Sequence, residues 1–488
     1  SVTAAELREA FALEEGHLYL ARDIEKAKSA ALALLRNRGH ARAGLREDRR
    51  LDVDRRRVDL VLHLIEGDRY RVRRLDIDGN TVTKDQVVRR GLALKPGQLW
   101  SDRDRDRSVR EIRRTGVFDD GPGLRPTVLP QWDSAGPAGD GSALREVDVG
   151  VRVNETGTGQ FRFELGYSTA TAINVGAEFV ERNFDALRTV GMLTGQDTAW
   201  RGAGQVLKTS VKYNSERTSL GASWSNPHLW DGPYSLSLAF NRTDGEYNFW
   251  DAVRHVSTLT VGRSFLDNDL RLAAFYSYTD LEISDLETDA PDDALDHGGD
   301  HFLNTFGLRQ TLDLLDNPRL PTRGLRLQFE ETMNGDWAPA SEDYRELRFD
   351  ADAFLPLHTG DIGGVTFLRL SQLNRWLDPL GDTASVPFYD RLRGGGPAPA
   401  HRGFDRWDLG PREINRNGYE TEPGGTREWL TTLELSLPLQ GTNDGFRGVI
   451  FLDHGLVWQE GADLSWGDLR TAAGLGVRFP AMVLPVSL

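Results

Sequence analysis

Alternation of apolar and polar residues is the dominant pattern of this chain from about residue 157 to its end. Segments such as FRFELGYS (161–168), YSLSLAF (234–240) and TLELSLPL (432–439) repeat with a period of two, and helical spacing disappears. Because successive side chains of a β-strand point to opposite faces, each segment has one apolar and one polar face. The polar face carries Arg, Glu and Asp where the core of a soluble β-sandwich or β-helix would need apolar residues. The alternation therefore predicts a sheet with an apolar medium on one side and water on the other.

A closed transmembrane β-barrel satisfies this pattern, because its strands face lipid outside and a polar lumen inside. The region is about 330 residues long, which at ~10 residues per strand plus loops corresponds to roughly 16 antiparallel strands. Its connections are either short turns, as at 356–364 and 438–448, or long acidic stretches, as at 283–301, which we expect to be solvated. Outer-membrane barrels have this asymmetry between periplasmic turns and outer loops. The side chains expected to face lipid include Phe161, Phe163, Leu236 and Leu433.

The composition is compatible with such a barrel. The 488 residues carry a net charge of −15 and include no cysteine. Their mean hydropathy of −0.47 is low, but a barrel also reaches such a value because its two faces average out. The acidic balance argues against general nucleic-acid binding, and the lack of thiols argues against a disulfide scaffold or a thiolate metal site. The sequence contains no run of ~18 apolar residues, so it predicts no transmembrane helix.

The sequence contains none of the common catalytic or cofactor motifs. It has no GxSxG elbow, no HExxH, no phosphate-binding loop and no dinucleotide fingerprint. The glycines at 394–396 are not followed by a Lys-Ser/Thr pair, and the aspartates of 283–301 lack the spacing of an EF-hand loop. We therefore expect no enzymatic activity, no catalytic residue, no cofactor and no metal site.

The N-terminal part of the chain contains an internal repeat. GHLYLARD (16–23) aligns with GQLWSDRD (97–104) at an offset of 81 residues, and helical patterns at 23–39 and 102–116 accompany the two copies. Strand patterns follow both helices, so each copy reads helix, turn, helix, strand, strand.

The second copy is also preceded by a strand, YRVRRLDIDGN (70–80). Tandem β-α-α-β-β units with Gly-Asn after the first strand resemble POTRA domains. We expect one module at residues 1–69, without its first strand, a second at 70–156, and the barrel at 157–488.

An Arg-Gly-Phe loop adds a more specific resemblance. RLRGGGPAPAHRGFDRWDLGP (391–411) is similar to the sixth outer loop of the outer-membrane protein insertase superfamily, of the BamA and TamA type. Arg402, Gly403 and Phe404 would be the signature of that loop. His401 departs from the family pattern, which has a small aliphatic residue before the arginine, and this departure leaves the local packing open.

Two carboxylates are expected to hold this loop. FLDHGLVW (451–458) resembles the family's strand-13 signature and would place Asp453 beside Arg402, while the preceding strand carries Glu434. The alternation independently puts both carboxylates on the lumen side of adjacent strands. A guanidinium can donate charge-assisted hydrogen bonds to two such carboxylates, so we expect an inward-folded, tethered loop.

The resemblance implies a protein that inserts or translocates other proteins without a nucleotide or redox cofactor. A weakly closed barrel exposes a strand edge that can template an incoming strand. Phe161, Phe163, Leu165 and Tyr167 would belong to that seam strand. The implied partners are unfolded outer-membrane or secreted clients, outer-membrane lipid, and a periplasmic or inner-membrane partner bound by the POTRA modules. The implied location is the bacterial outer membrane, with the modules in the periplasm.

Other functions stay open from the sequence. A TamA-type role and a two-partner-secretion pore share this architecture with barrel assembly, and the GPREINRNG continuation of the loop favours barrel assembly or the TamA-type role. A passive porin would not need the N-terminal modules, and a soluble carbohydrate-binding β-protein would not need the arginine-carboxylate set.

The chain end suggests an incomplete barrel. After AGLGVRF (473–479), only VLPVSL (483–488) has a strand pattern, where the family has two more strands. We expect the sequence to be a fragment at both ends, with residues 161–168 unpaired on one side or paired there with a neighbouring chain or a non-native segment.

Overall fold

The structure is a computed structural model. It describes residues 2–13, 15–16, 18–118, 123–139, 144–168, 172–195, 200–247, 249–317, 320–335, 337–360, 363–395, 401–404, 408–443, 445–462, 466–478 and 484–485. Two compact units are present. One contains Ser1–Thr158 together with Arg182–Gly204, and the other contains Gly159–Glu181 together with Gln205–Val486. None of the described helices is long and apolar enough to cross a membrane.

The first unit begins with a helical pair and a hairpin. Its elements are α1 (Ala4–Phe11), α2 (Ala21–Arg36), β1 (Gly44–Asp52) and β2 (Arg57–Ile65). Strands β1 and β2 pair antiparallel along their whole length. A small core containing Val2, Leu35 and Ala43 lies beneath the helices. Helix α2 occupies most of the helical pattern expected at 23–39.

A three-stranded sheet covered by helices follows. Its elements are β3 (Tyr70–Asp78), α3 (Asp85–Arg90), α4 (Asp102–Arg114), β4 (Thr127–Pro137) and β5 (Arg145–Arg152). The strand order is β3-β5-β4, with β3 parallel and β4 antiparallel to β5. Ser101 begins α4 by accepting a hydrogen bond from the Asp104 backbone N–H at 3.2 Å. Trp100 and Ile112 pack with the inward valines of β5 to form the core.

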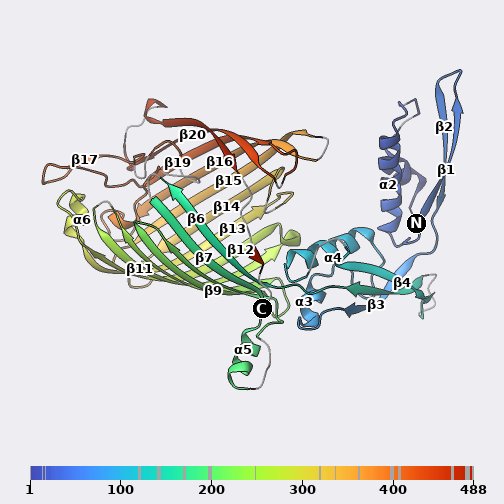
Figure 1. Cartoon of the computed structure of the whole chain (residues 1–488), viewed down its shortest axis with the longest axis horizontal. Coiled ribbons are helices and arrows are strands. Elements are labelled where there is room, and N and C mark those ends of the chain that lie inside the picture. Colours follow the sequence, from blue (N-terminus) through green and yellow to red (C-terminus); the bar gives the residue numbers. More distant parts are fainter. Residues whose placement is uncertain are drawn as a thin grey trace. The chain divides into compact units, whose positions relative to one another are not determined.

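The second unit is dominated by one sheet of fifteen strands in the described part of the chain (Figure 1). The strands are β6 (Gly159–Ser168), β7 (Ala172–Phe184), β8 (Gln205–Tyr213), β9 (Arg217–Leu229), β10 (Tyr234–Glu246), β11 (Asp251–Phe265), β12 (Leu270–Ser284), β13 (Gly299–Asp313), β14 (Gly324–Asn334), β15 (Tyr344–Thr359), β16 (Val365–Pro379), β19 (Arg427–Pro438), β20 (Arg447–Trp458), β21 (Arg470–Arg478) and β22 (Leu484–Pro485). From β6 to β21, each strand of this sheet lies beside the next one, and β22 lies beside β6. The strand pairs from β8 to β21, and the pair β6–β7, are antiparallel. This confirms the predicted fold class, a large antiparallel β-structure after α+β modules.

The longest connection joins β16 to β19. It contains β17 (Glu413–Ile414) and β18 (Glu420–Thr421), which pair with each other and lie outside the large sheet. The predicted Arg-Gly-Phe loop is part of this connection.

The two faces of the sheet differ as the alternation predicts. Phe163 and Leu433 are exposed on the outer face, whereas Phe161 and Leu236 are half-buried. Polar side chains meet on the inner face, where Arg369 pairs with Asp352 at 2.6 Å.

Helices interrupt the region in which we expected strands and loops only. Helix α5 (Ala186–Leu193) lies between β7 and β8, and α6 (Asp292–Asp296) lies in the acidic stretch after β12. That stretch is also less solvated than predicted, because Ala290 and Ala294 are buried against Phe388 and Trp250. Both helices are short, so neither leaves a long periodic pattern in the sequence.

The ends of the sheet meet at two positions. Leu484 of β22 pairs with Phe161 of β6, and Pro485 pairs with Gln160. The expected unpaired edge is therefore wrong at Phe161. From Arg162 to Ser168, β7 is the only described neighbour of β6. Val483 and residues 486–488 lie outside the described residues.

Candidate functional site

The Arg-Gly-Phe turn lies against the inner face of the barrel sheet. Gly403 adopts a φ of 86°, and a Cβ at this position would lie 2.9 Å from the Cβ of Ala472 on β21. Both the left-handed conformation and the close approach favour glycine. The turn therefore brings the backbone of the loop directly onto a barrel strand. Residues 396–400 and 405–407, on either side of the turn, lie outside the described part of the loop.

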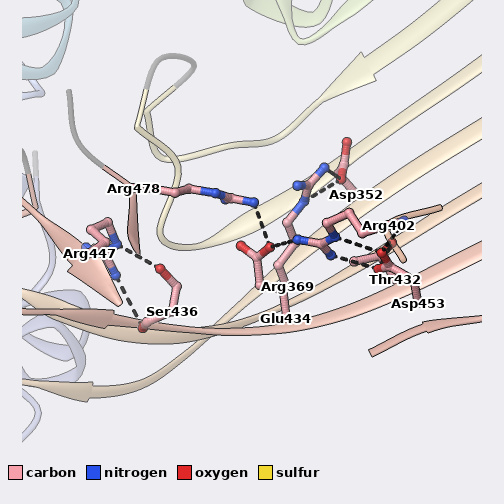
Figure 2. Close-up of polar contacts among 9 residues, drawn as sticks. All are labelled: Asp352, Arg369, Arg402, Thr432, Glu434, Ser436, Arg447, Asp453 and Arg478. Atoms are coloured by element: carbon pink, nitrogen blue, oxygen red, sulfur yellow. Dashed lines mark hydrogen bonds and ion pairs between the residues drawn. The ribbon is translucent and has the colours of Figure 1, made fainter. Parts of the chain in front are cut away.

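Arg402 makes its main contact with Asp453 (Figure 2). Its Nε donates to Oδ2 and its Nη2 to Oδ1, both at 2.7 Å, and its backbone N–H donates to Oδ2 at 3.1 Å. The guanidinium carbon lies 3.5 Å from the ring centroid of Phe451. This paired geometry uses the planar fork of arginine, which lysine does not have.

A second carboxylate accepts a hydrogen bond from the remaining nitrogen of the guanidinium, Nη1. Nη1 of Arg402 donates to Oε2 of Glu434 at 3.2 Å. Glu434 lies on β19 and Asp453 on β20, two adjacent strands in which Glu434 is opposite Phe451. The exposed fractions of Glu434 and Asp453 are 0 % and 1 %. Buried carboxylates are strongly unfavourable unless they are paired and hydrogen-bonded, so the arginine is needed where it lies.

The polar side chains around Asp453 complete its hydrogen bonding. Thr432 donates from Oγ1 to Oδ1 of Asp453 at 2.8 Å. On the same face of β19, Ser436 accepts a hydrogen bond from Nε of Arg447 at 2.8 Å. This face of β19 therefore belongs to the lumen, as the alternation at 432–439 predicts.

His401 stands where the family pattern has a small aliphatic residue, and the sequence alone did not show how its side chain packs. It is buried, its Nε2 lies 2.9 Å from the carbonyl oxygen of Arg470, and its ring packs edge-on against Phe404 with centroids 4.8 Å apart. Phe404 in turn packs against a buried cluster that includes Leu392 and Leu409. The imidazole thus joins the loop to β21 by a polar contact that an aliphatic residue would lack.

Arg478 is a site residue that sequence reasoning missed. Its Nη2 donates to Oε2 of Glu434 at 2.6 Å, the same oxygen that Arg402 contacts (Figure 2). The alternation of β21 could have revealed this residue, because it places Arg478 on the same face of the strand as Gly474 and Gly476. A Cβ at Gly474 would lie 2.5 Å from the Phe451 ring, which identifies that face as the one towards the loop. Glu434 therefore connects the loop to β21 through two cations.

The predicted seam residues lie on β6, and no described contact joins them to Arg402. Phe163 and Leu165 are exposed, and Phe161 packs against Phe179 with ring centroids 4.7 Å apart. The side chain of Tyr167 lies outside the described residues. Within the described part of the chain, no group of three or more His, Asp or Glu side chains could hold a metal ion.

Comparison with known proteins identifies the family. The family model described as "Omp85 superfamily domain" matches residues 199–488. The chain belongs to the Omp85 superfamily. A POTRA family model, "Surface antigen variable number repeat", matches residues 70–127.

The relatives and solved structures agree with this assignment. "Outer membrane protein assembly factor BamA" of Neorickettsia risticii is 23% identical over 90% of this chain and 54% of its own length. The BamA of Neisseria meningitidis is 23% identical over 94% of this chain and 55% of its own length. The chain thus spans about half the length of these curated relatives.

The fold is similar to solved structures over most of the chain. BamA from Haemophilus ducreyi lacking POTRA domains 1–3 superposes with a TM-score of 0.66 at 17% identity, covering 97% of this chain and 90% of that one. CdiB from Acinetobacter baumannii gives 0.53 at 13% identity, covering 97% and 79%. The protein is an outer-membrane β-barrel protein whose POTRA region lies in the periplasm.

Proposed function

We propose that this Omp85 protein inserts client β-barrel proteins into the outer membrane. The observation that carries the proposal is the buried contact of Arg402 with Asp453 and Glu434, which fixes an outer loop inside the barrel. A passive porin needs an open lumen and has no use for a loop held by two buried carboxylates. The named function of the BamA relatives, outer-membrane protein assembly, agrees with this role.

The mechanism we propose is strand templating at β6. Within the described residues, Arg162–Ser168 pair with β7 only, so one row of their backbone groups is available to another strand. An unpaired backbone group in hydrocarbon costs several kcal/mol, so an incoming client strand is stabilised by pairing there. In this mechanism the Arg402 contact keeps β19, β20 and β21 rigid while the seam at β6 opens.

The POTRA modules supply a second surface for strand pairing. In the sheet β3-β5-β4, strand β4 is an edge strand. An extended client segment or a periplasmic partner could add to that edge by β-augmentation, in which main-chain hydrogen bonds supply affinity without demanding one sequence. Catalysis has no part in this mechanism, and the relatives are named as assembly factors rather than enzymes.

Secretion of a partner polypeptide is the second candidate function. The fold likeness to CdiB favours it, but that likeness is weaker than the likeness to BamA. We rank barrel assembly first because sequence similarity to BamA extends over 90% of the chain. Client identity distinguishes the two functions: an assembly factor inserts barrels, whereas a secretion pore releases a soluble polypeptide.

The decisive experiment is client insertion into liposomes by the Arg402→Ala variant. We expect loss of insertion with the barrel still folded, because the strand ladder does not depend on this contact. Arg326→Ala is the matched control, since it breaks an ion pair between β14 and β13, with Asp313 at 2.8 Å, that lies away from the loop. Full insertion by Arg402→Ala would remove this arginine from the mechanism. Co-purification of bound clients from both variants identifies the client class.

A further inference from the structure

Helix α5 exposes its apolar residues and turns its polar residues inward. Leu187 is 77 % exposed, Val190 60 % and Met192 41 %. Arg188, by contrast, points into the protein and donates from Nη1 to the carbonyl oxygens of Val82 at 3.2 Å and Arg201 at 3.0 Å. A surface helix in water has the reverse arrangement, with its apolar stripe against the core. The outer face of α5 therefore fits an apolar medium.

Buried polar contacts hold the N-terminal end of α5 in place, so the fold itself exposes the apolar side chains of this helix. Asp185 is buried, caps α5 by accepting from the Arg188 backbone N–H at 3.1 Å, and pairs with Lys84 at 2.6 Å. The Lys84 backbone N–H donates to the Gly202 carbonyl oxygen at 2.8 Å, and Asn183 donates to Thr83 Oγ1 at 2.9 Å. These contacts hold both ends of the β7–β8 connection on the loop that precedes α3.

Chain connectivity decides which apolar medium is available. Only Asp185 separates the last residue of β7 from the first residue of α5. The chain leaves the second POTRA module, enters β6, and returns along antiparallel β7, so α5 follows the periplasmic end of a membrane-spanning strand. Exposed apolar side chains of β7 and β8, such as Ile173, Val175 and Val211, mark lipid-facing positions towards the ends of these strands that are remote from α5. Because a single residue separates α5 from a strand with lipid-facing positions, lipid is the apolar medium within reach of its outward face.

We propose that α5 is an interfacial anchor that inserts Leu187, Val190 and Met192 into the periplasmic leaflet of the outer membrane. Its length of eight residues is too short to span a bilayer but sufficient to lie in the headgroup region. Because the same segment holds the loop before α3 through Lys84 and Arg188, the anchor ties the second POTRA module to the membrane surface. The occupant of the apolar face is lipid, independently of which client the barrel handles.

Site-directed spin labelling tests the anchor directly, because the chain has no native cysteine. The full chain is labelled singly as L187C, V190C or M192C and reconstituted in phosphatidylethanolamine–phosphatidylglycerol vesicles. We expect relaxation by oxygen to exceed relaxation by a water-soluble nickel chelate at all three positions. V175C on β7 is the lipid-facing reference, and L51C in the first module, also exposed, is the aqueous reference.

Two outcomes would overturn the proposal. Preferential relaxation of the α5 labels by the nickel chelate would place the helix in water. Shielding from both reagents would show that protein, either a client or a second copy, covers it.

A charge-insertion variant separates membrane insertion from labelling artefacts. In the L187E/V190E background, the label at Met192 should lose its oxygen preference, because two carboxylates oppose burial in the acyl region. The matched background L51E/V53E, with two other exposed apolar residues replaced, should leave that label unchanged. A Met192 label that keeps its oxygen preference in the L187E/V190E background would contradict the proposed role of the two side chains.

Discussion

Replacing Asp453 with Asn should release the lumen loop far more readily than replacing Glu434 with Gln. Asp453 accepts three hydrogen bonds from Arg402, at 2.7, 2.7 and 3.1 Å, whereas Glu434 accepts one from it at 3.2 Å. The amide of Asn keeps the shape of the carboxylate, but it removes the charge and turns an NH₂ group towards a donor. The change therefore tests the electrostatic part of the contact with little loss of packing.

The expected magnitude follows from the burial of the pair. Hydrogen bonds to charged groups contribute roughly 1.5–3 kcal/mol each, and breaking a buried ion pair costs about 3–5 kcal/mol. Because Glu434 still holds Arg402 in the Asp453→Asn variant, we take the lower end, about 3 kcal/mol. About 1.4 kcal/mol corresponds to a factor of ten, so loop opening should become more than a hundredfold more frequent. For Glu434→Gln, with its single long contact to the loop, we expect about tenfold.

Hydrogen exchange of the Arg402 amide measures this opening, because that N–H donates to Asp453 only while the loop is docked. Exchange is followed by mass spectrometry on the full chain in detergent micelles or nanodiscs. Asp313→Asn is the control, because this residue pairs with Arg326 on β14 at 2.8 Å, away from the loop, and should leave the Arg402 amide unchanged. An unchanged amide in Asp453→Asn, or a larger effect in Glu434→Gln, would refute the reasoning.

The remaining predictions concern three other residues. Arg478→Ala should accelerate amide exchange in β21 by no more than about tenfold, because this side chain is 47 % exposed and its ion pair is partly screened. His401→Val should increase proteolysis of the loop, since the Arg470 carbonyl oxygen loses its partner at a cost of about 1–3 kcal/mol. Burial opposes ionisation of Glu155, but hydrogen bonds from the loop at 81–83 outweigh it and lower its pKa below the ordinary value of 4.5. Its stabilisation of the unit that contains the sheet β3-β5-β4 is therefore present above pH ~4.5 and disappears as the pH falls through the lowered pKa. Pulse proteolysis of the full chain should show this acid sensitivity reduced in Glu155→Gln.

Local sequence patterns determined the elements and faces of the barrel. Side-chain direction in a strand depends only on position parity, so the alternation at 432–439 places Glu434 inward without knowledge of any partner. The same rule places Asp453 inward, and the adjacency of consecutive strands in an antiparallel sheet brings the two carboxylates together. The resemblance of the loop and of FLDHGLVW to the insertase superfamily then assigned Arg402 to these carboxylates, and the need of a buried carboxylate pair for a cation supports that assignment.

Only the tertiary structure decided the contacts that depend on register between distant segments. Arg478 reaches Glu434 because β21 pairs with β20 in one particular register, and nothing within either strand specifies that register. The pairing of Leu484 with Phe161 joins segments more than three hundred residues apart, and it closes part of an edge that local alternation leaves free. The outward face of α5 was equally invisible to the sequence, because a single short helix has two faces and the contact of Lys84 with Asp185 selects which one turns outward. The face on which a strand residue lies follows from its position along that strand, which is local. The register between strands and the orientation of a short helix depend on partners far away in the chain.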